Sequence, residues 1–351
     1  MKKTILLAFV ALALTSCNTI MVFHMDVLRP AFHMSPTDNK SFLLVDNSGL
    51  QPANFAHTYL EKGVFLRDTT FDTDTLSSLI LESISKKVSD QRFYDQVGVS
   101  KREDVRFRKV GSRDFTEASL LNSTQIHELS DSMKVDFLVS LDQMILQTRT
   151  NMSSNAYIST ATRDVKVFTA WSAYDVKADS LLYQFQYIDS LYWENYAANP
   201  KTASTDLPKM ESTLPEIADV LAEKLAMIVS PYWEKVNRAY YSTGSVRMKY
   251  AVDCMRNDDW EGAAALWRDE FNYGFGRSVY RAALNMMLYE EYMHTPDDAL
   301  SWVDKVEKAM KNCIIGANDI DIWYFGKLKE LLNVRSVEYA KLKRYFEHNQ
   351  N

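Results

Sequence analysis

The chain has 351 residues, a formal net charge of −6, and 46% hydrophobic and 25% charged residues. This length is sufficient for two globular domains, each with its own hydrophobic core. A mildly acidic chain without a basic run lacks the electrostatic footprint of a nucleic-acid-binding protein, or of a protein held by anionic lipid headgroups.

Residues 1–16 have the pattern of an export signal. Two lysines precede an apolar segment, residues 5–14, that is too short to cross a bilayer, because spanning takes roughly 20 residues. The segment LTSC (residues 14–17) resembles a bacterial lipobox. This resemblance implies cleavage before Cys17, diacylglycerol on its sulfur and an acyl chain such as palmitate on its new amine. Several acyl chains form a stable anchor to a membrane; the alternative is an ordinary secretory signal.

Cleavage would leave 335 of the 351 residues and, with Lys2 and Lys3 removed, a net charge of −8. The residue after Cys17 is not acidic, which by resemblance to bacterial sorting signals implies the outer membrane, on its periplasmic face, with surface display left open. Cys254 and Cys313 remain as thiols. The periplasm would permit them to pair, but single cysteines on different helices are commonly small buried hydrophobes, so the pairing stays open.

In the first region of the mature chain, from about Phe23 to Trp193, strand patterns alternate with helix patterns. Strands are predicted at 23–32, 41–48 and 104–110, and helices at 73–88, capped by Thr73 or Asp74, and at 122–136, where Ser123 and Ile126 do not form a capping box. Residues 137–148 are almost continuously apolar, which is typical of a central strand buried on both faces.

A long hairpin follows, with strands at 165–176 and 181–193 and a turn at 177–180. One face of the second strand carries Leu181, Tyr183, Phe185, Tyr187, Leu191 and Trp193, while Gln184, Gln186 and Ser190 point the other way. The order of elements predicts an α+β fold, in which helices cover a mixed sheet.

The segment SDSMKVDFLVSLDQM (residues 130–144) is a helix end that runs into a buried strand, ahead of the hairpin. This order resembles the small α/β domain of TolB amino-terminal regions and of the curli-secretion lipoprotein family. The resemblance covers about 150 residues and implies a domain for assembly and protein contact.

The segment at 197–210 is rich in small, polar and proline residues and is expected to be a loop between domains. Residues 211–241 are expected to form one long helical stretch, with the aromatic residues of 231–241 packed against the helices that follow. The predicted domains are therefore a signal peptide at 1–16, an α/β domain at 17–205 and a helical domain at 211–351.

Residues 245–271 resemble a tetratricopeptide repeat. Ala251 and Ala263 occupy the positions where two antiparallel helices approach closely, and Trp267 fills the space beyond. A second copy at 277–310 has Asn285, Asp297, Ala299 and Val303 in corresponding places. Residues 319–332 and 336–348 are expected to form a capping pair of helices. The combination of the lipobox, the α/β domain, the segment WEKVNRAYY (residues 233–241) and the repeat pair resembles a family of Bacteroidetes lipoproteins. This resemblance covers most of the chain and implies a lipoprotein but no particular activity.

Motifs of catalysis and cofactor binding are missing from the sequence. It has no G-x-S-x-G and no phosphate-binding glycine loop, and His127-Glu128 is followed by Asp131 where a zinc helix needs a second histidine. Asp68, Asp72 and Asp74 lack the glycine and distal glutamate of a calcium loop. We therefore expect no enzyme, no cofactor and no metal.

The leading interpretation is a non-enzymatic scaffold for outer-membrane assembly or maintenance, whose helical repeats hold an envelope protein or peptide. The predicted groove consists of Met248, Val252, Met255, Arg256, Arg281, Leu284, Leu288, Glu291 and Tyr292. An alternative is that, in so short an array of repeats, most of these residues pack against the neighbouring domain. A second functional hypothesis is a surface lipoprotein that binds glycans for nutrient capture, since some such lipoproteins also carry tetratricopeptide helices. The aromatic strand from Tyr183 to Trp193 could stack on sugar rings, although core packing is the more usual use of such a face.

Overall fold

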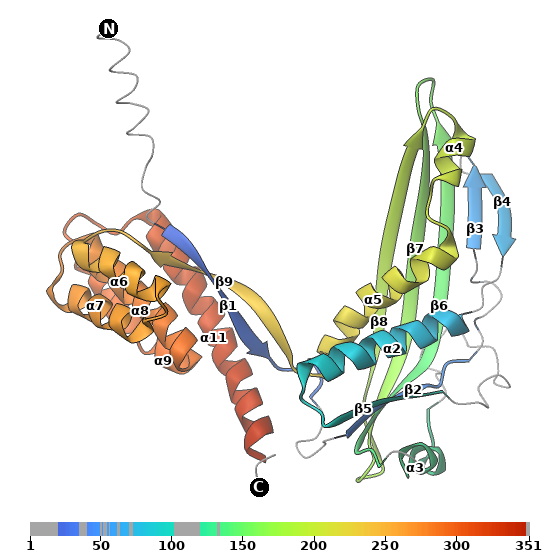
Figure 1. The fold of residues 1–351 in the computed structure, drawn as a ribbon, viewed down its shortest axis with the longest axis horizontal. Helices are drawn as coiled ribbons and strands as arrows, with labels where there is room; N and C mark the ends of the chain where they lie inside the picture. Colours follow the sequence, from blue (N-terminus) through green and yellow to red (C-terminus); the bar gives the residue numbers. More distant parts are fainter. Residues whose placement is uncertain are drawn as a thin grey trace. The chain divides into compact units, whose positions relative to one another are not determined.

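A computed structural model describes residues 20–34, 41–49, 51, 55, 57–61, 64–69, 73–101, 120–131 and 134–348. The described residues form two compact units (Figure 1). Residues 31–232 form the sheet unit, and residues 20–30 together with Trp233–Glu347 form the helical unit. The predicted fold class, a mixed sheet with covering helices followed by a helical region, is confirmed. None of the described helices combines the length and the apolar character needed to cross a membrane.

The sheet unit is built around one long central strand. Its elements are β2 (Ser41–Asp46), β3 (His57–Glu61), β4 (Val64–Thr69), α2 (Asp74–Gln91), β5 (Gln96–Lys101), α3 (Ser123–Asp131), β6 (Phe137–Ser154), β7 (Ser159–Asp175), β8 (Ser180–Ala197), α4 (Pro200–Thr205) and α5 (Met210–Val229). β6 pairs antiparallel with β7 along its whole length, and β7 pairs with β8. On its other edge, β6 pairs in parallel with β2 near its start and with β3 near its end. β5 pairs in parallel with the other edge of β2, and β4 pairs antiparallel with the other edge of β3.

The prediction of a central strand at 137–148 is confirmed, because the first ten residues of β6 are all buried. Helices α2 and α5 cover one face of the sheet (Figure 1), and their apolar sides meet in a core that includes Leu76, Ile80, Ile217 and Leu221. α3 covers the start of the strands on the other face, where Ile126 packs beside Tyr174.

The predicted hairpin is also confirmed, and it is longer than the sequence indicates. Its turn joins Asp175 to Ser180. The predicted apolar face of β8 packs towards α5, with Tyr183, Phe185 and Trp193 partly buried against the core. Helix α5 lies in this same core, so it belongs to the sheet unit. The boundary between the units falls between residues 232 and 233, rather than near Glu211 where the sequence places it.

The prediction of one helical stretch from 211 to 241 is wrong. α5 ends at Val229 because Ser230 precedes Pro231 and adopts an extended conformation, as residues before proline commonly do. The following segment is a strand, β9 (Tyr232–Tyr241), which pairs with β1 (Ile20–Arg29) in a separate two-stranded ribbon.

Three smaller differences concern helix ends and a loop. Residues 122–125 do form a capping box, since Asn122 and Gln125 each accept a hydrogen bond from the other's backbone N–H at 3.0 Å. The expected loop at 197–210 contains α4, which Asn199 caps. Thr73 lies at the cap position of α2 without a side-chain capping bond. The predicted strand at 104–110 and Cys17, the residue expected to be acylated, lie outside the described residues.

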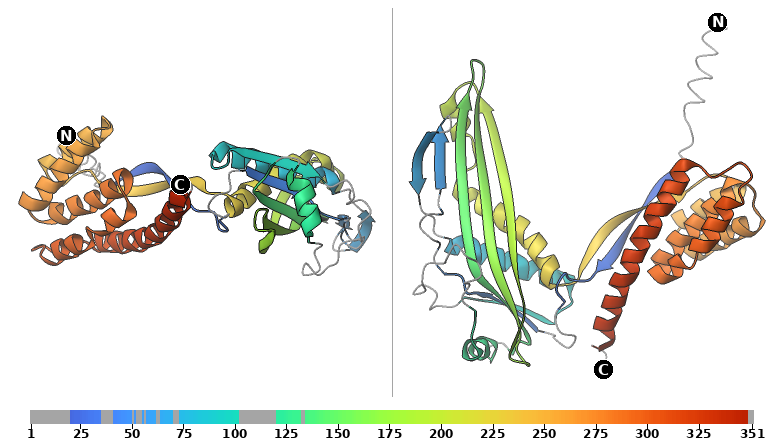
Figure 2. Two further views of the ribbon diagram at one scale, coloured as in Figure 1. Left: turned by 90° about the horizontal axis from the view of Figure 1, so that it is seen from below. Right: turned by 180° about the vertical axis from the view of Figure 1, so that it is seen from behind.

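The helical unit combines the β1–β9 ribbon with antiparallel helices (Figure 2). The helices are α6 (Val246–Arg256), α7 (Trp260–Tyr273), α8 (Arg277–Met293), α9 (Pro296–Leu300), α10 (Val303–Lys311) and α11 (Asp319–His348). Ala251, Ala263, Ala299 and Trp267 are fully buried in their core. The expected capping pair is instead the single 30-residue helix α11. Asn333-Val334-Arg335, where the pair was expected to separate, contains no glycine or proline to end a helix.

Candidate partner-binding site

The structure does not leave the predicted groove open. Met248, Val252, Leu284, Leu288 and Glu291 are buried, with at most 6% of each residue exposed. Met255 and Arg281 are partly buried, whereas Arg256 and Tyr292 are exposed. A partner could therefore reach only the margin of this surface.

The β1–β9 ribbon fills the predicted groove. Met25 and Val27 from β1 and Tyr240 from β9 form a buried cluster with Val252 of α6 and Leu288 of α8. At the margin, the ring of Phe23 contacts Trp260 and Tyr292, with centroids 4.8 and 5.0 Å apart. Most of the predicted set is therefore buried, as the alternative interpretation expects, but it packs against the ribbon of the same unit and not against the neighbouring sheet unit.

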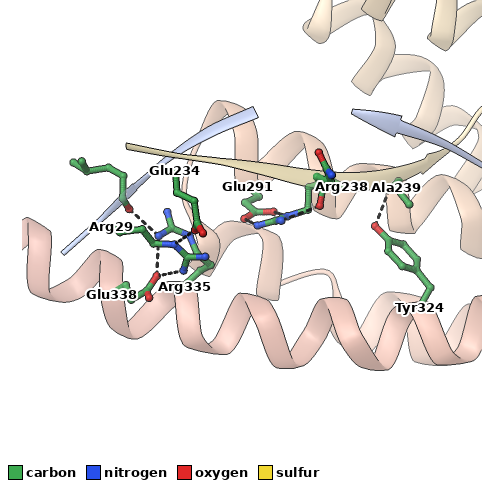
Figure 3. A network of polar contacts seen from close by, with 10 residues as sticks. Arg29, Glu234, Arg238, Ala239, Glu291, Tyr324, Arg335 and Glu338 are labelled. Carbon is green, nitrogen blue, oxygen red and sulfur yellow. Dashed lines mark hydrogen bonds and ion pairs between the residues drawn. The ribbon is translucent and has the colours of Figure 1, made fainter. Parts of the chain in front are cut away.

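A buried ion pair fixes β9 to α8 (Figure 3). Arg238 donates from Nε and Nη2 to the two carboxylate oxygens of Glu291, both at 2.7 Å. Their side chains are only 3% and 1% exposed. Such a two-bonded guanidinium–carboxylate pair fixes direction as well as distance, so it sets how the ribbon lies on the helix.

A second polar cluster joins the other end of the ribbon to α11 (Figure 3). Arg29 contacts Glu234 at 2.7 Å and Glu338 at 2.6 Å. Arg335 donates to Glu338 at 2.9 Å and to the backbone carbonyl of Leu28 at 2.8 Å. β1 is thereby connected directly to α11, and β9 is connected to it through Arg29.

The opposite end of α11 carries a buried carboxylate, Asp321. It accepts hydrogen bonds from Tyr241 at 3.0 Å, from Tyr280 at 2.6 Å and from Nε of Arg281 at 2.9 Å. Burial, together with this carboxylate, raises the pKa of Tyr280 to about 12. The predicted groove residue Arg281 therefore belongs to the interior of the unit.

Asn285 completes the attachment of the ribbon. Its side-chain amide donates to the carbonyl of Tyr241 and accepts from the N–H of Tyr241, both at 2.8 Å. The amide thus takes the place of a neighbouring strand at the end of β9. The sequence identified Asn285 only as a repeat position, because its partner is not near it in the chain.

The sheet unit also contains a buried carboxylate, Asp142, that has its partners within the fold. Asp142, which lies at an irregularity between β6 and β7, accepts hydrogen bonds from Asn47 at 2.9 Å, from Ser140 at 2.7 Å and from Ser172. In the described part of the chain, no group of three or more metal-binding side chains comes together. Cys254 and Cys313 are partly buried free thiols.

An open surface occurs instead on β8. Among the described strands, this 18-residue strand pairs only with β7, so its outer edge has no strand neighbour. On the face turned away from α5 it exposes Ile188, Tyr192 and Tyr196, each more than half exposed. The right-hand view of Figure 2 shows this face of the long strands. We call Ile188, Tyr192, Tyr196 and the outer edge of the strand the β8 surface.

Charged residues of the neighbouring strands flank the β8 surface on the side of β7. Asp164 lies opposite Tyr192 across the β7–β8 pairing and opposite Arg149 across the β6–β7 pairing. Arg149, Asp164 and Lys166 also line a hollow of about 530 Å³. Aromatic residues within a charged rim are typical of protein contact surfaces.

Sequence reasoning missed the β8 surface although a signal was present. Period-two counting from Tyr183 places Ile188, Tyr192 and Tyr196 on the face of Gln184, which was expected to be solvated. Three large side chains on such a face are unusual. The predicted sugar-stacking face, from Tyr183 to Trp193, instead packs against the core.

Two family models match the chain, one over residues 39–241 and one over residues 249–348. They describe the domains of unknown function DUF8603 and DUF6340. The first match contains α5 and β9, and the second begins within α6. Among curated proteins, none matches the chain.

Solved structures that match part of this chain include the PelC dodecamer from Paraburkholderia phytofirmans, with 8% identity over 59% of this chain and 98% of that chain (TM-score 0.24). A putative neuraminyllactose-binding hemagglutinin homolog from Helicobacter pylori is 7% identical over 55% of this chain and 88% of that chain (TM-score 0.24). Lipoprotein GNA1162 from Neisseria meningitidis is 11% identical over 53% of this chain and 98% of that chain (TM-score 0.20). These scores are too low to carry a functional argument. The match over residues 39–241 spans more than half of the sequence, so the chain belongs to the DUF8603 family.

Proposed function

We propose that this protein is a lipid-anchored lipoprotein of the outer membrane, on its periplasmic face, that binds an envelope protein or peptide without catalysing a reaction. Its role would be in assembly or maintenance of the outer membrane. The anchor rests on the lipobox-like segment at 14–17, with Cys17 as the acylated residue. The non-enzymatic role rests on the absence of catalytic motifs from the sequence.

The observation that carries the binding role is the β8 surface. A long edge strand presents unpaired backbone N–H and C=O groups, to which an extended segment of another protein can add as a further strand. Its backbone would supply affinity, and contacts with Ile188, Tyr192 and Tyr196 would supply selectivity. The helical hairpins α6–α7 and α8–α10 would be degenerate tetratricopeptide-like repeats, supported by the buried alanines at 251, 263 and 299.

Site-specific crosslinking in living cells tests this proposal. A photoreactive amino acid at position 192 should form adducts with an envelope protein or peptide, and one at Arg256 should not, although both side chains are exposed. Adducts from position 256 alone would favour the margin of the predicted groove. Absence of adducts from positions 188, 192 and 196 would contradict partner binding at the β8 surface.

The anchor is tested separately with Cys17→Ala. This variant should lose its acyl chains by mass spectrometry and should leave the membrane fraction during a high-pH carbonate wash. Retention of the variant in washed membranes would contradict anchoring through Cys17.

A further inference from the structure

One end of the helical unit collects large apolar side chains that are open to solvent. Tyr273 and Phe275 lie at the turn between α7 and α8, Ile314 and Ile315 lie between α10 and α11, and Trp323 lies near the start of α11. Their exposed fractions are 76%, 76%, 83%, 62% and 65%. We call these five residues the apolar end.

The turns of the apolar end lie side by side. Nε of Arg277 donates to the carbonyl of Gly316 at 3.1 Å, which joins the α7–α8 turn to the α10–α11 turn. Phe275 and Ile314 also line one hollow of about 450 Å³, together with Phe271, Val279, Lys305 and Lys308. Phe275 and Ile314 therefore share one hollow, and the two turns that carry them are joined, whereas scattered apolar side chains would need no explanation.

The chain enters the unit at this same end. Asp321, in the first turn of α11, bonds to Tyr241 at the end of β9. The neighbouring Tyr240 contacts Met21 in β1 through its hydroxyl at 3.5 Å. The beginning of β1 and the beginning of α11 therefore lie together, as Figure 1 also shows.

The length of chain ahead of β1 connects this end to the anchor. Cys17 precedes Ile20, the first residue of β1, by three residues. Three residues span at most about 10 Å even when fully extended. If Cys17 carries the acyl chains of the proposed function, the start of β1 must lie at the lipid surface, and the apolar end beside it must face the same surface.

We propose that the apolar end is a membrane-docking surface whose occupant is the lipid bilayer. Aliphatic side chains such as those of Ile314 and Ile315 gain free energy on entering the acyl region, while tryptophan and tyrosine favour the headgroup level. Lys305 and Lys308 at the hollow can keep their ammonium groups in water while their stems contact lipid. The acyl anchor would then set the distance from the membrane, and the apolar end would set the orientation of the helical unit.

The location of this surface rests on the proposed anchor, but its affinity for lipid does not, so the two can be tested apart. The chain without residues 1–17 retains every described residue. We expect it to sediment with vesicles of phosphatidylethanolamine and phosphatidylglycerol, with a partition constant on the order of the 10⁴ M⁻¹ of a single myristoyl chain. Replacing both Ile314 and Ile315 with Gln should weaken this binding about tenfold or more.

Matched controls come from the same unit. Val334 and Val337 on α11 are 57% and 59% exposed, and replacing both with Gln should leave vesicle binding unchanged. Brominated lipids should quench tryptophan fluorescence less in Trp323→Phe than in the parent, whereas Trp233→Phe, at another exposed tryptophan, should keep the quenching.

Either of two results would overturn the proposal. One is that the chain without residues 1–17 fails to sediment with vesicles at about 1 mM lipid. At this concentration, even binding about tenfold weaker than that of a single myristoyl chain would be half-saturated. The other is equal binding by the parent and the Ile314/Ile315 variant. If that variant instead loses self-association in analytical ultracentrifugation while its vesicle binding is unchanged, the surface joins copies of the chain, and the membrane proposal is wrong. Loss of acylation at Cys17 would contradict the anchor without affecting these measurements.

Discussion

At the scale of single residues, the helical unit depends on charges that have been removed from water. Arg238 and Glu291 are almost completely buried and bond to each other through two contacts. Moving each charge out of water is costly, and their mutual attraction offsets this cost only while both are present. The pair therefore fixes the position of β9 on α8. Removing one partner should lower stability far more than replacing both.

Glu291→Gln should lower the free energy of unfolding of the helical unit by about 3 to 5 kcal/mol, because the guanidinium of Arg238 would remain buried without a counter-charge. Chemical denaturation followed by tryptophan fluorescence would measure the change. Lys343→Gln, which removes an exposed pair with Glu347, should cost less than about 1 kcal/mol. Equal effects of the two substitutions would mean that the buried pair does not form.

The raised pKa of Tyr280 predicts how the stability of the helical unit changes at alkaline pH. Its pKa in the folded state is about 12 because of burial and the Asp321 carboxylate, against about 10 in an unfolded chain. Between pH 10 and pH 12 the unfolded chain has already released the Tyr280 proton, which the folded chain retains. The contribution of Tyr280 to stability is therefore fully present below pH 10 and is lost as the pH rises through about 12.

In Tyr280→Phe this alkaline decline should be shallower, because one titrating group is removed. At neutral pH the same variant should lose about 1.5 to 3 kcal/mol, since the hydroxyl no longer donates to Asp321. Unfolding curves at pH 8, 10 and 12 would measure both effects. A decline as steep as that of the parent would mean that Tyr280 does not contribute to it.

At the scale of secondary-structure elements, the sequence predicts best where one periodicity dominates. β6 and the β7–β8 hairpin follow from a continuous apolar run and a clean alternation. β9 was mistaken for a helix because Trp233, Val236 and Tyr240 are also spaced as on a helix face. In addition, the inward position 238 holds an arginine, which hides the alternation of the strand. Its counter-charge, Glu291, comes from a distant helix that no local pattern reveals.

The single helix α11 gives a direct test at this scale. Val334 is in the middle of the helix and exposed. Val334→Pro should lower stability by about 3 kcal/mol or more, because proline removes a backbone hydrogen bond and clashes with the preceding turn. Val334→Ala should change thermal stability little. If Val334→Pro melts like the parent, the chain turns near this residue, and the capping pair expected from the sequence is correct.

At the scale of the whole molecule, segments far apart in sequence complete the helical unit. β1 pairs with β9 about 200 residues later, as in the contact of His24 Nδ1 with Asn237 Oδ1 at 2.6 Å. The sequence identified the buried alanines and the helix pairs, but it could not show that β1 occupies the predicted groove. For the same reason, the sequence could not show that β8 is an edge strand, since this depends on the order of strands in the sheet.

The β1–β9 ribbon fills the predicted groove of the helical unit, and hydrogen exchange tests this most directly. The backbone amides of β1 that donate to β9 should be protected to the same extent as those of α8. In Val27→Asp, which puts a charge into the buried cluster of Met25, Tyr240, Val252 and Leu288, the amides of β1 and β9 should lose protection while those of β6 keep it. If β1 amides of the parent exchange as fast as those of an unfolded chain while α6 and α8 stay protected, the groove is open and the account is wrong.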